Sequence, residues 1–193
     1  MNGPKVILAS TSVYRRMLLM RLGLDFECVR PHVSETPLMG EGGAELVVRL
    51  SEAKARAVAS DYPEAVIIGS DQVAVLDGTI VGKPGTVANA MAQLRQASGR
   101  QVVFYTGVCC LLGAGTCQVD IVSTRVTFQT LDEDKIRRYV ARDLPLDCAG
   151  SFKSEGLGVT LFDKIEGDDP SALIGLPLIR LCRMLEQAGV VFY

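Results

Sequence analysis

The residues best suited to chemistry in this sequence are charged side chains that follow short apolar runs. The run Val6–Ala9 leads into two hydroxyl residues, Ser10 and Ser12, and then into Arg15 and Arg16. The pattern predicts a strand followed by a helix that starts near Ser12. A helix N-terminus carries about half a positive charge, so arginines in its first turn are favourable only where an anion binds. Backbone N–H groups, hydroxyls and guanidinium groups together suit a phosphate. The alternative is that both arginines point into solvent or pair with distant carboxylates.

Asp71 gives a second signal, because it ends another apolar run, Val66–Gly69. The Asp77-Gly78 pair predicts a tight hairpin in which Gln72 lies opposite Lys83. Strict alternation directs Asp71 and Lys83 to opposite faces of the sheet. The glycine and proline that flank Lys83 predict a break in the ladder, which lets the lysine reach a ligand shared with Asp71. A metal-bound triphosphate suits such a pair. Ordinary surface charge at the base of a hairpin is the alternative.

Other charged residues do not indicate a function when each is considered alone. Glu35 falls in a predicted loop, where a glutamate usually has no special role. Lys54 falls on the polar side of a predicted helix and is expected to be solvated. It completes a Ser-x-x-Lys pattern with Ser51, which is common without its companion motifs. The loop Gly150–Gly156, which includes Glu155, is either a binding loop or a surface turn.

Composition narrows the classes of function. The chain has 193 residues, 48% of them hydrophobic, and a net charge of −2, which argues against nucleic-acid binding through bulk charge. His32 is the only histidine, so acid–base chemistry is expected to rest on carboxylates, lysines or metal-bound water. No Cys-x-x-Cys pair occurs, and Cys109 and Cys110 are expected to be buried, reduced thiols. No apolar run reaches the roughly 20 residues of a membrane span, and none resembles a signal peptide. We therefore predict a cytoplasmic protein.

The elements that must position these residues alternate between strands and helices. Their order predicts an α/β fold with a mixed sheet in a single domain over residues 1–193. Predicted strands cover residues 6–9, 66–68 (continuing or resuming at 73–76), 79–81, 101–112 and 118–128, the last two joined across 113–115. Predicted helices cover residues 12–23, 44–60, 86–97, 132–141 and 170–189.

Taken together and in this order, the segments resemble the Maf family of nucleotide pyrophosphatases. The resemblance runs from Lys5 to the last predicted helix and is specific because all its motifs occur in register. They are Leu8-Ala9-Ser10-Thr11-Ser12 with Arg15-Arg16, Glu35-Thr36, Lys54-Ala55, Gly69-Ser70-Asp71, Gly82-Lys83-Pro84, Tyr105-Thr106-Gly107 and Gly150-Ser151-Phe152.

The resemblance implies an elongated, twisted sheet whose flanking helices form two lobes around a central cleft. It implies a hydrolase that splits a nucleoside triphosphate between the α and β phosphorus atoms with a divalent cation, Mg²⁺ or Mn²⁺. The resemblance also implies that Asp71 is the general base and that Glu35 and Asp71 bind the metal. The phosphates are neutralised by cationic and hydroxyl side chains, namely Arg15, Lys54, Lys83 and Ser10, with Ser12 and Arg16 in the same phosphate-binding segment.

Three features are similar to the branch of the family that acts on 7-methyl-GTP: Tyr14, Gln72 after Asp71, and the loop that contains Glu155. Tyr14 is expected to stack on the cationic base, and Glu155 to accept hydrogens from the guanine edge. Tryptophan is the residue expected at the Tyr14 position in that branch. A dTTP/UTP pyrophosphatase of the same family and a non-enzymatic nucleotide-binding regulator of cell division are the alternatives. A homodimer is a family-based expectation, and neither nucleic acid nor membrane is expected as a partner.

Overall fold

Strands and helices alternate along the chain in the computed structural model, which describes residues 3–113 and 115–193. The strands are β1 (Val6–Ala9), β2 (Phe26–Val29), β3 (Val66–Leu76), β4 (Thr79–Val81), β5 (Gln101–Leu112), β6 (Cys117–Phe128) and β7 (Phe162–Gly167). The α-helices are α1 (Val13–Met20), α2 (Gly43–Arg56), α3 (Val87–Ala97), α4 (Glu133–Asp143) and α5 (Leu178–Gln187). Short 3-10 helices are η1 (Ala59–Asp61), η2 (Ala149–Ser151), η3 (Leu157–Leu161) and η4 (Ala172–Ile174). Ala114, within the predicted 113–115 connection, lies outside the described residues.

The strands form one seven-stranded sheet in the order β2-β1-β3-β5-β6-β7, with β4 paired to β3. β1 runs parallel to both β2 and β3, whereas the β3–β4 and β6–β7 pairs are antiparallel. The predicted mixed α/β fold is therefore confirmed. None of the helices in the described part of the chain is long and apolar enough to cross a membrane.

The predicted hairpin at Asp77-Gly78 is present. Leu76 pairs with Thr79, and the two turn residues have φ angles of 47° and 77°, the left-handed values of a two-residue type I′ turn. The last registered pair joins Ala74 to Val81, where β4 ends. The ladder therefore stops before Lys83, as the glycine and proline beside that residue predict.

The chain divides into two compact units, each built from separate stretches of sequence. The first contains residues up to Asp71, Thr106–Val122 and Asp169–Tyr193. The second contains Gln72–Tyr105 and Ser123–Asp168. The boundaries fall inside β3, β5 and β6, so each of these strands contributes residues to both units.

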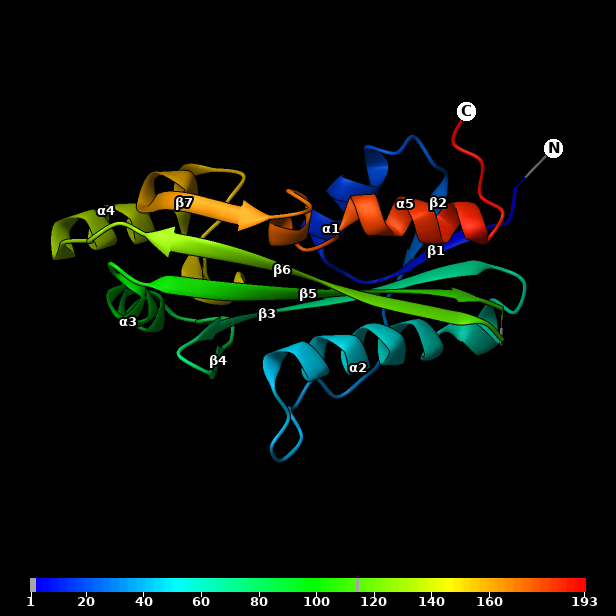
Figure 1. Ribbon diagram of the computed structural model, residues 1–193, viewed down its shortest axis with the longest axis horizontal. Coiled ribbons are helices and arrows are strands. Elements are labelled where there is room, and N and C mark those ends of the chain that lie inside the picture. The colour runs from blue at the N-terminus through cyan, green and yellow to red at the C-terminus, as the bar shows by residue number, and fades with distance from the viewer. Residues whose placement is uncertain (1–2, 114) are drawn as a thin grey trace. The chain divides into compact units, whose positions relative to one another are not determined.

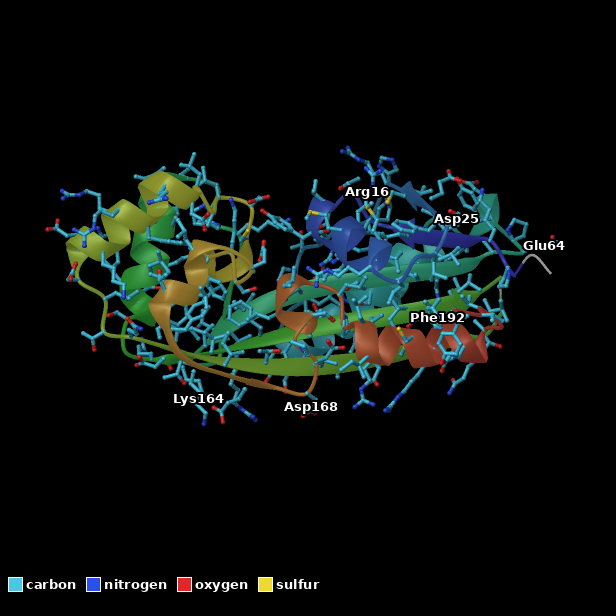
Figure 2. The ribbon with its side chains drawn as sticks, turned by 90° about the horizontal axis from the view of Figure 1, so that it is seen from above. Arg16, Asp25, Glu64, Lys164, Asp168 and Phe192 are labelled. Atoms are coloured by element: carbon cyan, nitrogen blue, oxygen red, sulfur yellow. The ribbon has the colours of Figure 1, made fainter. Side chains whose placement is uncertain are left out.

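The core of the first unit has two halves, because successive strand residues face opposite sides of the sheet. Helices α1 and α5 cover one face and α2 covers the other (Figure 1). Cys110 faces the α1 and α5 side, and Cys109 faces the α2 side. Both thiols are free and buried, as predicted, and burial raises the pKa of Cys110 to about 12. Phe192 packs against the α5 side (Figure 2).

Four phenylalanines form an aromatic cluster in the second unit. Phe152 packs edge-to-face on Phe104, Phe128 and Phe162, with ring centroids 4.6–5.6 Å apart. This geometry is favourable for aromatic rings beyond the apolar area that they bury. The cluster fixes the start of the loop that carries Glu155.

The structure corrects several predicted boundaries. The final helix does not span residues 170–189, because α5 begins only at Leu178 and Asp169–Pro177 forms a loop with one turn of 3-10 helix. Side chains of this loop bind backbone N–H groups in place of a helical ladder. The predicted 44–60 helix stops at Arg56, and the predicted 12–23 helix begins at Val13 and stops at Met20. Sequence analysis missed β2 and β7, because neither strand has an apolar run and only one of their residues, Phe162, is buried.

Two glycines allow α2 to lie unusually close to the sheet. A Cβ atom on Gly69 of β3 would stand 2.0 Å from the carbonyl oxygen of Ser51, and one on Gly107 of β5 would stand 2.4 Å from that of Val47. Both contacts are with helix backbone, which cannot move aside as a flexible side chain can. The missing side chains at these two positions therefore set the distance between α2 and the sheet.

We expect Gly107→Ala to push α2 away from the sheet and to lower the free energy of unfolding by about 1–3 kcal/mol, the usual range for overpacking. Thermal and urea unfolding measure the loss. Gly115→Ala is the matched control, because its nearest neighbour would lie at an ordinary 3.8 Å. Equal stability of the two variants would contradict the close-approach explanation.

Candidate functional site

The segment between β1 and α1 is held by its own hydroxyl groups. Ser10 Oγ accepts a hydrogen bond from the Ser12 N–H (3.1 Å), and Ser12 is the N-cap of α1 and accepts from the Arg15 N–H (3.3 Å). Capping by serine explains why the helix starts here. A hydroxyl that accepts from an N–H group can still donate its own proton, which suits a phosphate oxygen.

Arg15 turns back from α1 onto the loop before α5. Its Nε atom donates to the carbonyl oxygen of Gly175 at 2.8 Å, and its side chain is half-buried. Burial lowers the pKa of the guanidinium, while the negative charges of Asp71 and Glu35 oppose that shift. A carbonyl dipole offsets less of the cost of burying a cation than an anion does. The guanidinium therefore favours a bound anion.

The structure separates the two neighbouring arginines. Arg15 lies in the field of Asp71 and Glu35, whereas Arg16 is exposed on α1 and its charge acts on Cys28 of β2 (Figure 2). Adjacent residues on a helix project about 100° apart, so both cannot face one small ligand in the same way. Tyr14 is half-buried in the same turn. Phosphate binding by Arg16 stays a prediction.

A lysine and two carboxylates meet at the end of the first unit's part of β3. Lys54 Nζ lies 2.6 Å from Asp71 Oδ1 and 2.6 Å from Glu35 Oε1. Lys54 and Asp71 are only 5% and 7% exposed, while Glu35 is open to solvent. Segments far apart in sequence therefore converge on one buried ammonium group.

The expectation that Lys54 is solvated is wrong. Its position on α2 faces the sheet because the glycines of β3 and β5 let the helix approach. Ser51, one turn earlier, accepts a hydrogen bond from the Asp71 N–H at 3.1 Å and donates to the Val47 carbonyl at 2.5 Å. Because residues three apart on a helix lie on the same face, both side chains of the Ser-x-x-Lys pattern reach Asp71. Ser51 binds its backbone N–H, and Lys54 binds its carboxylate.

The loop that carries Glu35 is fastened to α2 by an arginine that sequence analysis missed. Arg49 binds Glu41 through two hydrogen bonds of 2.5 and 2.7 Å and donates to the Thr36 carbonyl at 3.3 Å. The hydrogen bond from Arg49 is the main cause that lowers the pKa of Glu41 to about 2. Glu41 also accepts from the Leu38 N–H, so the loop folds back on itself beside Glu35.

The loop that receives Arg15 is organised by Asp169, which is 2% exposed. One oxygen of Asp169 accepts from the backbone and hydroxyl of Ser171, and the other accepts from the Ile179 N–H at 2.7 Å. Ser171 in turn accepts from the Leu178 N–H. These bonds satisfy the first turn of α5, which begins after a proline without a side-chain cap. Ser70 Oγ lies 3.0 Å from the Gly175 carbonyl, the same atom that binds Arg15.

Three predicted site residues belong to the second unit. Lys83 is exposed in the loop between β4 and α3, and Glu155 is exposed in the loop after the aromatic cluster. Gln72 is half-buried and follows Asp71 directly in β3, so it faces the other side of the strand. Their roles stay predictions.

Comparison with known proteins gives the family. The model of the family described as "Maf-like protein" matches residues 5–188 of this chain, a stretch that contains every predicted site residue. The chain belongs to the Maf family.

Curated Maf relatives are similar over nearly the whole length of the chain. A protein of Aromatoleum aromaticum is 54% identical over 99% of each chain, and one of Pseudomonas aeruginosa is 56% identical over 97% of this chain and 98% of its own. Both are named "7-methyl-GTP pyrophosphatase". Among solved structures, a HAM1 protein from Coxiella burnetii has a TM-score of 0.54 and 14% identity, covering 95% of this chain and 99% of its own. That likeness concerns the fold.

The donor set of this Maf site fits a hard divalent cation. Among residues 3–113 and 115–193, no three histidine, cysteine or acidic side chains are grouped to hold a metal ion. Glu35 and Asp71 nevertheless meet at one ammonium group, so the structure brings two carboxylates to one point. Magnesium is commonly held by one or two carboxylates together with substrate phosphates and water. The pair therefore fits a metal that arrives with a polyphosphate.

We expect Lys54→Met to lower the free energy of unfolding by about 3 kcal/mol, because it leaves the Asp71 carboxylate buried without its partner. Adding Asp71→Asn should recover much of that loss, since no buried charge then remains. Urea unfolding of the two single variants and the double variant measures the coupling.

Lys5→Met is the matched control, because Lys5 also binds a glutamate at 2.8 Å but is exposed, and exposed pairs contribute about 1 kcal/mol at most. If Lys54→Met costs no more stability than Lys5→Met, burial of the Lys54–Asp71 ion pair does not make it important for stability.

Proposed function

We propose that the protein hydrolyses 7-methyl-GTP to 7-methyl-GMP and diphosphate. The observation that carries the proposal is the meeting of Lys54, Asp71 and Glu35 beside Arg15, a cation that favours an anion. The names of relatives more than 50% identical over nearly the full chain support both the reaction and this substrate. The proposed place of action is the cytoplasm, where thiols such as Cys109 stay reduced.

Phosphoryl transfer depends on positioning and charge neutralisation more than on a covalent nucleophile. In the proposed reaction a water molecule adds to one phosphorus atom of the α–β bond, and the bridging oxygen leaves with the other. Asp71 accepts the proton of that water. Its backbone is held by Ser51 and its carboxylate by Lys54, so its position is fixed before the substrate arrives.

Cationic and hydroxyl side chains of the site are proposed to offset the negative charge of the phosphates. Arg15 is held by the Gly175 carbonyl through Nε, and the rest of its guanidinium is suited to phosphate oxygens. Ser10 and Ser12 supply hydroxyl protons at the start of α1. Lys83, exposed in its loop, is proposed to contribute a further charge to the triphosphate.

Magnesium or manganese is the proposed cofactor, with Glu35 and Asp71 as its protein ligands. Bound there, the metal would lower the pKa of water and polarise the phosphoryl oxygens. Lys54 occupies the point between the two carboxylates, so we expect its ammonium group to keep them in place.

Selection of the base is assigned to Tyr14, Gln72 and Glu155. A methylated guanine carries a positive charge, which an aromatic face attracts through its quadrupole. The Glu155 carboxylate suits the N–H groups on the guanine edge. Gln72 lies next to the proposed base in β3, where it is suited to contact the nucleotide beside the reacting bond.

The decisive measurement is diphosphate release from a panel of nucleotides, including 7-methyl-GTP, GTP, dTTP and UTP, with Mg²⁺, Mn²⁺ or a chelator. We expect 7-methyl-GTP to react fastest and the chelator to abolish turnover. Asp71→Asn should lower kcat by about 10²–10⁴-fold, the usual contribution of a general base. Asp61→Asn, on an exposed aspartate, is the control.

A preference for dTTP and UTP in the same panel would replace the proposed substrate while leaving the reaction intact. Absence of diphosphate release from every nucleotide, with wild type and Asp71→Asn alike, would favour a binding module instead.

We expect Tyr14→Trp to raise the ratio of kcat/KM for 7-methyl-GTP over GTP by about 2- to 5-fold, because indole attracts cations more strongly than phenol. Tyr14→Leu should lower that ratio while turnover of GTP stays near the wild-type value. Steady-state kinetics on the two nucleotides tests this. An unchanged ratio in both variants would remove Tyr14 from base recognition.

A further inference from the structure

The side chain of Gln93 on α3 connects two loops of the second unit. Its Nε2 atom donates to the Gly82 carbonyl at 3.2 Å, and its Oε1 atom accepts a short hydrogen bond from Ser151 Oγ. Because a carbonyl oxygen only accepts hydrogen bonds, the amide nitrogen must face Gly82, which leaves the amide oxygen for the hydroxyl of Ser151. One amide group therefore joins the segment before Lys83 to the segment before Glu155.

The Lys83 end of this link is held on both sides of the lysine. Asn89, one helical turn before Gln93, donates through Nδ2 to the Pro84 carbonyl at 2.9 Å. The carbonyl groups directly before and after Lys83 are thus both bound by amides of α3. The Lys83 side chain itself is exposed. This arrangement fixes the backbone of the lysine and leaves its ammonium group to a ligand.

The Ser151 end of the link is conformationally unusual. Ser151 is fully buried and has a φ angle of 63°, and it follows Gly150, whose φ is 73°. Residues with a side chain adopt this left-handed region uncommonly, and such outliers gather at functional sites. Gly150 cannot be replaced without conflict, because a Cβ atom there would stand 2.9 Å from Phe104. The chain therefore presents the Ser151 hydroxyl in a forced direction, and Gln93 receives it.

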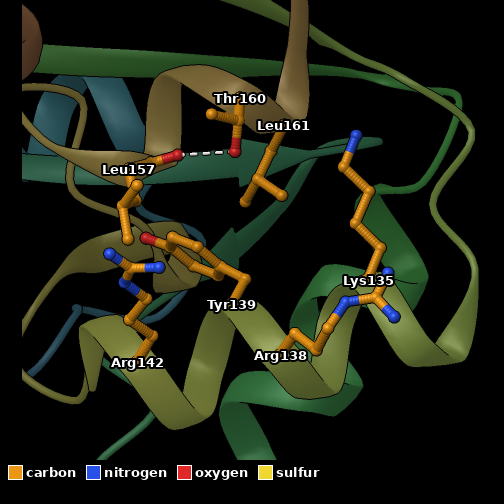
Figure 3. Close-up of a pocket in the computed structure, with 7 residues that line it drawn as sticks. All are labelled: Lys135, Arg138, Tyr139, Arg142, Leu157, Thr160 and Leu161. Carbon is orange, nitrogen blue, oxygen red and sulfur yellow. Dashed lines mark hydrogen bonds between the residues drawn. The ribbon is translucent and has the colours of Figure 1, made fainter.

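The rest of the Glu155 loop is anchored from α4. The Lys153 N–H donates to Tyr139 Oη at 3.0 Å, and Lys153 Nζ donates to the Asp143 carbonyl at 2.6 Å. Figure 3 shows Tyr139 between Arg142 and Leu157, which belong to the walls of a pocket beside α4. The base of the loop is thus fixed on α3 and α4, and Glu155 is exposed at its tip.

We propose that Gln93 is a positioning residue that couples the phosphate-binding lysine, Lys83, to the base-selecting loop that carries Glu155. The inference rests on the proposed function, which assigns those two roles. Gln93 contacts neither the phosphates nor the base in this proposal. It acts through the Gly82 carbonyl at one end and through the Ser151 hydroxyl at the other.

The two ends of the link can be broken separately. Gln93→Glu keeps an acceptor for Ser151 but removes the donor to Gly82, so kcat/KM should fall by a similar factor for every nucleotide. Ser151→Ala keeps the Gly82 bond and should lower the preference for 7-methyl-GTP over GTP. Each change is expected to be about 3- to 10-fold, the range for one hydrogen bond. Gln93→Leu should show both effects, and adding Ser151→Ala to it should not change the preference further.

Gln96→Leu is the matched control, because Gln96 is an exposed glutamine three residues further along α3. It should leave rate and preference at their wild-type values. Thermal unfolding of all variants separates a loss of stability from a loss of positioning. If Gln93→Leu has the rate and nucleotide ranking of wild type, or only the effects of Gln96→Leu, the inference is wrong.

Amide hydrogen exchange provides a readout that does not depend on catalysis. We expect faster exchange over residues 82–86 and 150–156 in Gln93→Leu than in wild type or Gln96→Leu. Unchanged exchange in both segments would overturn the coupling even if the enzyme is active. Conversely, faster exchange together with a wild-type protein that releases no diphosphate from any nucleotide would overturn the proposed function and leave the physical link in place.

Discussion

Burial of one ammonium group between two carboxylates is the constraint on which the site depends. An unpaired buried charge is strongly unfavourable, so Lys54, Asp71 and Glu35 must stay together once α2 has packed on the sheet. That packing requires glycine at positions 69 and 107, where a side chain would strike the helix backbone. The charges are thus held by a close contact between helix and sheet, and the helix is in turn kept in register by the charges and by Ser51.

The cost of such an arrangement is consistent with a polyanion as the missing partner. Arg15 is half-buried against a carbonyl oxygen and lies in the field of the same two carboxylates. A triphosphate with its divalent cation brings both signs of charge, so it can pair with the guanidinium and with the carboxylates at once. A neutral ligand would leave the Arg15 guanidinium with only a carbonyl oxygen as its hydrogen-bonded partner, and an isolated anion would be repelled by the acidic pair.

Much of the fold was predictable, and the exceptions have physical causes. Apolar runs such as Val66–Ile68 identify buried strands, and the Asp77-Gly78 turn sets its hairpin register without tertiary information. β2 and β7 were missed because strands with almost no buried residues carry no apolar pattern. Lys54 was misjudged for a related reason: its burial depends on Gly69 and Gly107, which lie on strands 15 and 53 residues away in sequence. Helix periodicity depends only on the residues of the helix. It therefore cannot predict that a polar residue of α2 will be covered by a sheet surface with glycines on two neighbouring strands. Lys54 and Glu35 were predicted as site residues only through the resemblance to the Maf family, because the local sequence patterns around them gave no such signal.

The supporting residues found only in the structure share a common chemistry. Arg49, Asp169 and Gln93 each bind backbone carbonyl or N–H groups of a loop. Loops expose backbone groups that no ladder satisfies, and a side chain that satisfies them also fixes the loop. Each of the three also binds a side chain, respectively Glu41, Ser171 and Ser151, so the anchors combine backbone and side-chain hydrogen bonds. The proposed proton transfer from water therefore rests on a buried, constrained residue, Asp71. The proposed choice of base rests partly on Glu155, which is exposed at the tip of an anchored loop.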